Sequence, residues 1–357
     1  MNSFKYKYFL ASNSSEGFIS VFKNRYNAED GWKSYIIKGG PGTGKSSFMK
    51  YIASKAHDKG LEIELCPCSS DPDSLDALVI PEKKVIILDG TAPHTVDPEY
   101  PAICEEILNF GSFWETEMLK SQSENIIKLT KKNKALHKSA SMYIMAAGEI
   151  LKDNFKIALG CRDELKILKF SKNLCKKYIP QKIGKGKEEI RFLYAITPKG
   201  VVSFANTATM NCKTQIIIED KYSAVSDEIM QNIRTHAILN GYNIITVKNS
   251  LLPSSLIDHI IIPELSLCFL REFDYQHFDS GVRRIHARRF LNNAKLSNSR
   301  ERLKFNRKLI NELLLNAISV LKQAKDVHDD IEEYYIRAMD FDALTLFAKD
   351  FCDKLLK

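Results

Sequence analysis

One segment near the start of the chain has the residue types and spacing of a polyphosphate-binding loop. Residues 39–46 read GGPGTGKS, a complete G-x-x-x-x-G-K-S pattern between the apolar run SYIIK and a helical sequence. Glycines let the backbone wrap a polyphosphate with its N–H groups inward, and the following helix adds its positive N-terminus. We expect Lys45 to reach the β- and γ-phosphates and Ser46 to place its hydroxyl on Mg²⁺. The predicted nucleotide-binding residues are Gly39, Gly40, Pro41, Gly42, Thr43, Gly44, Lys45, Ser46 and Ser47.

Such a loop needs a carboxylate at the end of a neighbouring strand to hold the metal. Residues 85–88 are four apolar residues followed by Asp89, as in a Walker B strand, one β–α step after the loop. Asp89 is therefore predicted to bind Mg²⁺ together with Ser46. A turn at the end of the strand is the alternative role for this aspartate.

The group that would activate water or an acceptor is less clearly marked. No glutamate follows Asp89, although many ATP hydrolases place a base there. His94 could position a water molecule, although a histidine in a proline-bounded loop is more often a surface residue. Asp71 and Asp73, in the acidic segment 69–76, could orient water or an acceptor, but caps and turns favour the same residues. The predicted catalytic residues are Lys45, Asp71, Asp73 and His94.

Two stretches of the chain repeat one pattern. Residues 35–82 align with residues 215–264 at a shift of 181, which becomes 182 after one inserted residue. Apolar, glycine and proline positions match in this register, for example Ile36 with Ile217 and Pro81 with Pro263. Matches in one register over about 50 residues indicate an internal duplication.

The second copy lacks the chemistry of the first. The residues aligned with Gly39, Lys45, Ser46 and Asp89 are Asp220, Ser226, Asp227 and Arg271. Two carboxylates would stand where phosphate should lie, and like charges repel. We therefore expect one nucleotide site, in the first copy.

Each copy predicts an α/β unit followed by a helical tail. Strands and helices alternate with the spacing of βαβ units, which indicates a duplicated P-loop NTPase-like fold with parallel sheets. The segments before Pro81 and Pro263 read as short helical or irregular pieces. Apolar residues at steps of three, four or seven then predict one long helical hairpin per copy. The tails could form a stalk for a partner, but packing of the two tails on each other is the simpler expectation. The predicted units are 1–180, with its tail from about 104, and 181–357, with its tail from about 284.

Composition limits the class of protein. The 357 residues include 52 Lys and Arg against 44 Asp and Glu, and a charged fraction of 27% is typical of a folded protein. No apolar stretch approaches the ~18–20 residues of a membrane span, and the first residues lack a signal-peptide pattern. The expected location is the cytoplasm. Eight scattered cysteines without a C-x-x-C pair argue against a structural zinc site.

The excess positive charge is concentrated in residues 283–308, which contain ten Lys or Arg and one acid. Such a basic segment could bind a polyanion, a membrane surface or a phosphate bound elsewhere on the molecule, or it could be a solvated helix face. Arginine fingers complete many P-loop sites. The candidates for that role are Arg283, Arg284, Arg288 and Arg289.

The segments KGGPGTGKSSFMK, CSSDPDSLDALVIPE, ILDGTAPH and ICEEILNFGSFWE resemble an uncharacterised family of bacterial tandem P-loop ATPases. The resemblance covers essentially the whole chain and implies a cytosolic ATP-binding protein with ATPase activity. Relatives can keep a second phosphate loop, whereas this chain has KYSAVSD there. Residues 39–47 and Asp89 are the positions that carry over.

Three functional hypotheses follow. The first is a Mg²⁺-dependent ATP-binding P-loop protein that hydrolyses ATP slowly and switches its domain arrangement or a protein partner held by the helical tails. The second is a kinase of a small molecule or nucleotide, with an acceptor at residues 71–76. The third is a nucleic-acid or anionic-surface binder regulated by ATP through residues 283–308. The loop pattern leaves the base, the oligomeric state and the pathway open.

Overall fold

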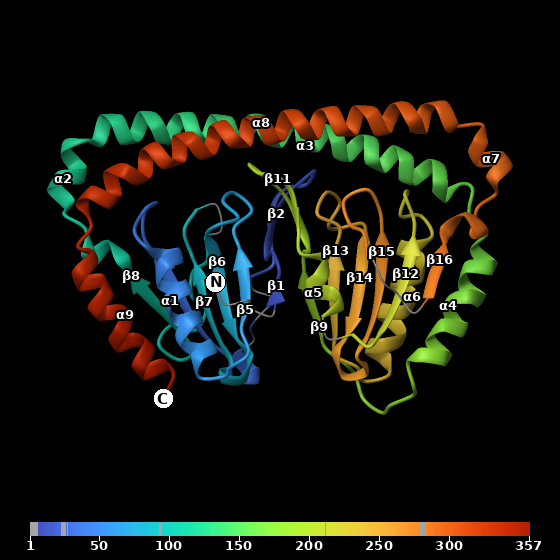
Figure 1. Cartoon of the computed structure of the whole chain (residues 1–357), viewed down its shortest axis with the longest axis horizontal. Coiled ribbons are helices and arrows are strands. Elements are labelled where there is room, and N and C mark those ends of the chain that lie inside the picture. The colour runs from blue at the N-terminus through green and yellow to red at the C-terminus, as the bar shows by residue number, and fades with distance from the viewer. Residues whose placement is uncertain (1–5, 23–25, 27, 93–94, 211, 279–282) are drawn as a thin grey trace.

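The structure is a computed structural model that describes residues 6–357, apart from 23–25, 27, 93–94, 211 and 279–282. Two α/β units lie side by side, and two long helices run across both of them (Figure 1). Each unit contains a six-stranded sheet and a two-stranded hairpin. The duplication read from the sequence is thus visible in the architecture.

The first unit has its sheet in the order β1-β5-β6-β7-β4-β8. The strand β6 runs antiparallel to both neighbours, and the other adjacent pairs are parallel. Its elements are β1 (Tyr6–Lys7), β2 (Ala11–Ser14), β3 (Gly17–Ser20), β4 (Lys33–Lys38), α1 (Lys45–Asp58), β5 (Glu64–Pro67), β6 (Leu75–Ile80), β7 (Val85–Asp89) and β8 (Glu105–Asn109).

The second unit repeats this arrangement, with its sheet in the order β9-β13-β14-β15-β12-β16 and β14 as the antiparallel strand. Its elements are β9 (Glu188–Arg191), β10 (Tyr194–Thr197), β11 (Gly200–Ser203), α5 (Ala205–Thr209), β12 (Thr214–Glu219), α6 (Ser226–Leu239), β13 (Ile244–Lys248), β14 (Ile257–Ile262), β15 (Leu267–Glu272) and β16 (Arg283–His286).

Four strands differ from the prediction. The pieces expected to be helical or irregular are the strands β6 and β14, in which all six residues are buried. A short, mostly apolar segment buried on both faces fits a strand covered on both sides, which periodicity alone does not separate from a buried helix. The expected helical tails begin with the edge strands β8 and β16. The sheets are therefore mixed, rather than purely parallel.

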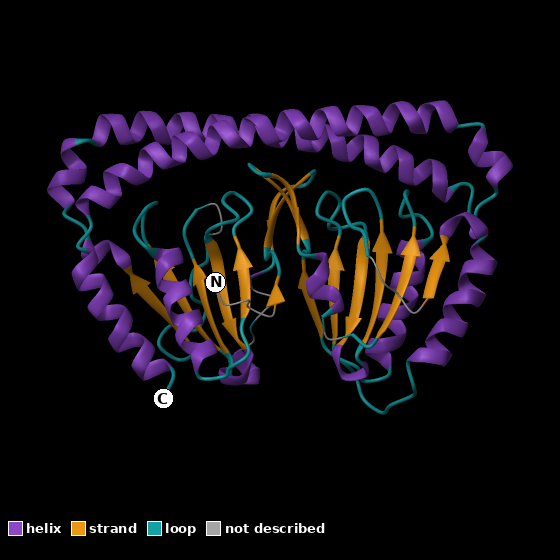
Figure 2. Ribbon diagram, viewed as in Figure 1, coloured by secondary structure: helices purple, strands orange, loops and turns teal. Residues whose placement is uncertain are grey.

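The remaining helices are α2 (Thr116–Ser121), α3 (Ser123–Leu159), α4 (Glu164–Tyr178), α7 (Asn293–Ser297), α8 (Arg300–Ala338) and α9 (Phe341–Leu355). The prediction of one hairpin per copy is wrong, whereas the expected packing of the two tails on each other is confirmed, because α3 pairs with α8 along their length (Figure 2). Asn133 of α3 donates to the Ala324 carbonyl at 2.7 Å, and Asp153 pairs with Arg302 at 2.6 Å, so the two helices are antiparallel. An apolar seam specifies a helical partner but does not say which one.

The terminal helices are exchanged between the copies. Helix α4 contributes Ile167 and Leu174 to the core of the second unit, although it precedes that unit in the sequence. Helix α9 contributes Leu344 and Ala348 to the core of the first unit, at the other end of the chain. The predicted boundary near residue 180 therefore separates the two copies in the sequence, but the two packed units do not follow it. Each sheet is covered by a helix that belongs to the other copy in the sequence.

The two units also meet directly between their sheets. Phe9 and Phe192 exchange backbone hydrogen bonds of 2.9 and 3.0 Å. Beside them, the fully buried Arg191 donates to the Glu64 carboxylate at 2.8 Å. A buried ion pair tolerates loss of neither partner, so this contact fixes the two units to each other.

Candidate functional site

The glycine-rich loop connects β4 to α1 at the carboxyl end of the strand. Gly42 and Gly44 have φ angles of 67° and 83°, which side chains with a Cβ rarely adopt. Close approach restricts the loop further, since a Cβ on Gly40 would lie 2.5 Å from the Tyr335 ring. The positive φ angles thus favour glycine at positions 42 and 44, and the contact with Tyr335 leaves no room for a side chain at position 40.

Lys45 and Asp89 lie together at the base of this loop. β7 pairs with β4 in a parallel register that sets Asp89 opposite Ile37, just before the loop begins. The Lys45 ammonium is 3.6 Å from Asp89 Oδ2 and donates to the Gly40 carbonyl at 2.6 Å. Both side chains are mostly buried, at 11% and 16% exposure. A cation and a carboxylate are therefore held where a phosphate and its metal would need them.

The hydroxyl groups of the loop are oriented by local hydrogen bonds. Ser46 Oγ accepts from the Leu75 amide at 3.0 Å, and Thr43 Oγ1 donates to the Gly40 carbonyl at 2.8 Å. Ser47 is exposed on the first turn of α1. Mg²⁺ takes oxygen ligands, and the Ser46 hydroxyl and the Asp89 carboxylate are donors of that kind. These two residues would hold the metal beside a bound polyphosphate.

The two aspartates proposed as catalytic are engaged elsewhere. Asp71 accepts from Ser74 Oγ at 2.8 Å and lies 3.7 Å from the ammonium of Lys325. Asp73 pairs with Lys199 of the second copy, and this hydrogen bond lowers the pKa of Asp73. With its side chain 74% exposed, Asp73 is a surface turn residue that the structure does not bring to the loop. His94 lies outside the described residues.

The four arginines proposed as fingers do not reach the loop. They lie on β16 and the turn after it, at the outer edge of the second sheet and far from α1 (Figure 1). Arg284 pairs with Glu219 at 3.1 Å and Glu272 at 2.9 Å, whereas Arg283 and Arg289 lie over the ring of Phe170. The arginine-finger prediction for Arg283, Arg284, Arg288 and Arg289 is therefore wrong. Acids and an aromatic ring of the second unit and α4 hold these residues in place.

Helix α8, from the other copy, covers the loop instead. The Gly42 amide donates to Glu332 Oε1 at 3.2 Å, and the Tyr335 ring packs against Gly40. Leu344 of α9 approaches Gly44 from the same side. The sequence carries no signal for these contacts, because some 290 residues separate Gly42 from Glu332.

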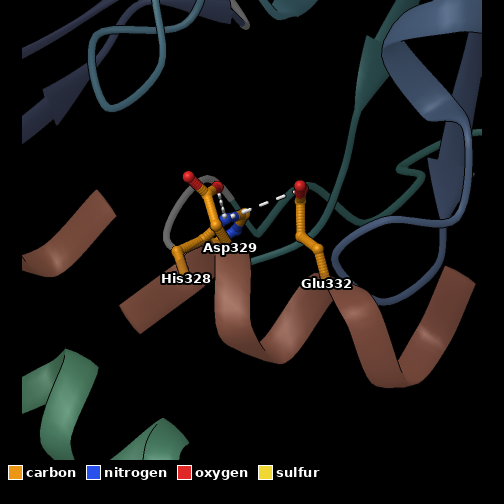
Figure 3. Close-up of side chains that lie close together, drawn as sticks. All are labelled: His328, Asp329 and Glu332. Atoms are coloured by element: carbon orange, nitrogen blue, oxygen red, sulfur yellow. Dashed lines mark ion pairs between the residues drawn. The ribbon is translucent and has the colours of Figure 1, made fainter. Parts of the chain in front are cut away.

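Three polar side chains project from one face of α8 near the loop (Figure 3). His328 Nδ1 lies 3.6 Å from Glu332 Oε1 and 3.9 Å from Asp329 Oδ1. One ligand atom from each lies within 4.8 Å of the others, so the group could hold a cation, although Lys325 already pairs with Asp329. On α3, burial and the nearby His328 lower the pKa of His137.

The corresponding loop of the second copy is closed by its own side chains. The Asp220 carboxylate accepts from the amides of Val225 and Ser226, at 2.9 and 2.8 Å. These amides lie at the N-terminus of α6, where a phosphate loop would bind phosphate. Arg271, at the position of Asp89, is buried against Asp258 at 2.6 Å. An internal carboxylate thus takes the anion position, in agreement with the expectation of a degenerate copy.

Comparison of the sequence with protein-family models found no match, and neither did comparison with curated proteins or with solved structures. Among the described residues, no helix combines the length and apolar character needed to cross a bilayer. Function must therefore be inferred from the geometry of the site.

Proposed function

We propose that this chain is a Mg²⁺-dependent ATP-binding protein of the P-loop class that hydrolyses ATP slowly. One observation carries the proposal: Lys45 begins the helix after a glycine loop and lies 3.6 Å from Asp89 on the adjacent parallel strand. A lysine, a row of backbone amides and a strand-end carboxylate in this order are the parts that P-loop proteins use to hold a polyphosphate and its metal.

Each residue has a defined task in this proposal. The amides of residues 42–46 and the N-terminus of α1 would bind phosphate oxygens, and Lys45 would neutralise charge on the β- and γ-phosphates. Ser46 and Asp89 would hold Mg²⁺, which supplies further charge neutralisation when bound. Ser46 Oγ accepts one hydrogen bond from the Leu75 amide and keeps a second lone pair for the metal, and the Lys45 ammonium, which donates to the Gly40 carbonyl, has two further N–H donors for phosphate.

The contact between the loop and α8 supports a switching role. Gly42 is bonded to Glu332 of a helix that spans both units, and α9 packs beside Gly44. A ligand that takes the Gly42 amide must break the bond to Glu332. Nucleotide occupancy would then change how the long helices sit on the first unit.

Calorimetric titration of the whole chain with ATP, with and without Mg²⁺, tests the proposal. We expect one ATP per chain and tighter binding with Mg²⁺. Asp89→Asn should remove most of that metal dependence, whereas the exposed Asp97→Asn, a matched change at a surface pair with Lys38, should not. Phosphate release without any acceptor would support hydrolysis. Turnover that needs an added acceptor would show phosphoryl transfer instead, and absence of ATP binding would refute the proposal.

A further inference from the structure

We propose that Glu332 is the acid–base residue of the site, supplied to the phosphate loop of the first copy by helix α8 of the second. The inference rests on the proposed function, because it assigns a role toward bound ATP. It addresses the feature that the sequence left open, namely which group accepts the proton of the attacking water.

Glu332 already reaches the loop. Its Oε1 atom is 3.2 Å from the Gly42 amide, one of the loop amides that face the β- and γ-phosphates in P-loop proteins. A triphosphate would take that amide and leave the carboxylate beside the γ-phosphate. The end of α8 is held near the loop by two backbone bonds, from Glu115 to the Ala338 carbonyl at 2.8 Å and from Asp340 to the Phe113 carbonyl at 2.7 Å.

The described part of the first copy offers no comparable base. Asp89 is followed by Gly90 and by Thr91, whose hydroxyl donates to Asp89 at 2.5 Å. Asp71 is bonded to Ser74, and Asp73 is paired with Lys199 at the surface. Among the described side chains, Glu332 is a carboxylate that bonds to the loop and has no role in the proposed metal site.

Comparison of the two long helices links the polar residues of α8 to the intact loop. One backbone bridge joins Trp114 to Met339, and an equivalent bridge in the other unit joins Leu291 to Arg162. Trp114 therefore corresponds to Leu291, and Arg162 corresponds to Met339. Both pairs differ by 177, so each residue of α3 corresponds to the residue 177 positions later in α8. The counterparts of Lys325, His328 and Glu332 are Gly148, Leu151 and Phe155. Leu151 and Phe155 pack against an apolar cluster that includes Leu251 and Leu252. At these positions α3 carries apolar side chains that serve packing, whereas α8 presents a carboxylate that bonds to the intact loop and a histidine beside that carboxylate.

The proposed step balances without a further reactant. The oxygen of water forms a bond to the γ-phosphorus, and the bond from that phosphorus to the β–γ bridging oxygen breaks. The electron pair of the broken bond leaves with the diphosphate, while the Glu332 carboxylate accepts a proton of the water. His328 Nδ1 lies 3.6 Å from Glu332 Oε1 on the same face of α8.

Glu332→Gln tests the assignment, and Glu333→Gln is its matched control. Glu333 is the next residue, 67% exposed and paired with Arg337 at 3.0 Å, so the control makes the same change in charge without touching the loop. Dissociation constants for Mg·ATP and single-turnover phosphate release are measured for both variants and the wild type. We expect Glu332→Gln to bind ATP at least as tightly as the wild type and to release phosphate about 100-fold more slowly. Glu333→Gln should match the wild type in both.

The outcomes separate this inference from the proposed function. Wild-type turnover by Glu332→Gln with ATP still bound would overturn the inference and leave the proposed function standing. Failure of the wild type to bind ATP would refute the proposed function itself. If Glu332→Gln does not fold, Glu332→Asp takes its place: slower release with retained affinity supports the inference, and an unchanged rate overturns it. Fluorescence of Trp114, whose ring centroid lies 5.7 Å from that of Tyr335, reports whether α8 remains docked.

Discussion

The loops at residues 39–46 and 220–227 occupy the same place in two copies of one fold but satisfy their backbone amides differently. In the first copy, glycines leave the amides accessible to a partner from outside the unit, and Lys45 and Asp89 lie beside them. In the second, the Asp220 carboxylate takes the amides, and Arg271 replaces Asp89. A few substitutions thus separate a loop whose amide accepts a partner from another helix from a loop that is closed by its own carboxylate, because the amides at a helix N-terminus need an acceptor.

The largest effect should come from the buried ion pair between Arg271, at the position that corresponds to Asp89, and Asp258. Arg271→Ala leaves the Asp258 carboxylate buried without its cation and should lower the free energy of unfolding by about 3–5 kcal/mol. Asp89→Ala, at the matching position of the first copy, should cost less, about 1.5–3 kcal/mol, because Lys45 is 3.6 Å from the carboxylate and keeps its bond to the Gly40 carbonyl. Guanidinium denaturation of both variants makes the comparison. Equal losses of stability would mean that Arg271 and Asp89 contribute equally to the fold, which would contradict a purely structural role for Arg271 alone.

Nucleotide affinity should respond to one loop only. Lys45→Ala should weaken Mg·ATP binding about 100-fold, because a charged hydrogen bond to phosphate contributes about 1.5–3 kcal/mol. Ser226→Ala, at the corresponding position, should leave the affinity unchanged. Calorimetric titration distinguishes the two, and an unchanged affinity in Lys45→Ala would remove the site assignment.

The stability of the fold should depend on pH through a buried histidine of the second copy. His259 corresponds to Ala77 of the first copy and is fully buried, and burial lowers its pKa to about 4. It accepts from the Arg271 amide at 3.1 Å and bonds to Gln276 at 2.6 Å, which suits the neutral ring. As pH falls below about 6.5, the unfolded chain binds a proton that the folded chain refuses, so stability falls.

The expected loss from this histidine between pH 7 and pH 5 is about 2 kcal/mol. His259→Gln should remove that part of the loss while the rest of the pH dependence persists. Urea denaturation at the two pH values measures it, and the same decrease in the variant and the wild type would contradict the role of His259.

The smallest effect concerns the internal anion. Asp220→Asn keeps an oxygen that can accept from Val225 and Ser226 but removes its charge, so it should cost about 1 kcal/mol of stability. The value comes from the shift in denaturation midpoint at low salt. A stabilised variant would mean that the carboxylate does not serve as the substitute for phosphate.

The sequence contained enough to locate the loop, the strand-end Asp89, the duplication and the loss of chemistry at Asp220 and Arg271. The predictions were wrong where one sequence pattern is compatible with two structures. The mostly apolar segment 75–80 could be a strand or part of a buried helix. For residues 283–289, the sequence showed the positive charge but not the surface that these arginines face. The acids Glu219 and Glu272 that pair with Arg284 lie on other strands, so their proximity depends on the sheet order.

By itself, the sequence determined the parts that depend on near neighbours: the glycine loop, the helix that follows it and the repeated unit. These follow from backbone angles and hydrogen bonds spanning a few residues. Only the tertiary structure decided that α3 and α8 pair in antiparallel directions, that α4 and α9 cross to the other unit, and that Glu332 meets Gly42. An apolar helical seam can pack on many surfaces of similar shape, and the choice among them is made by the whole fold.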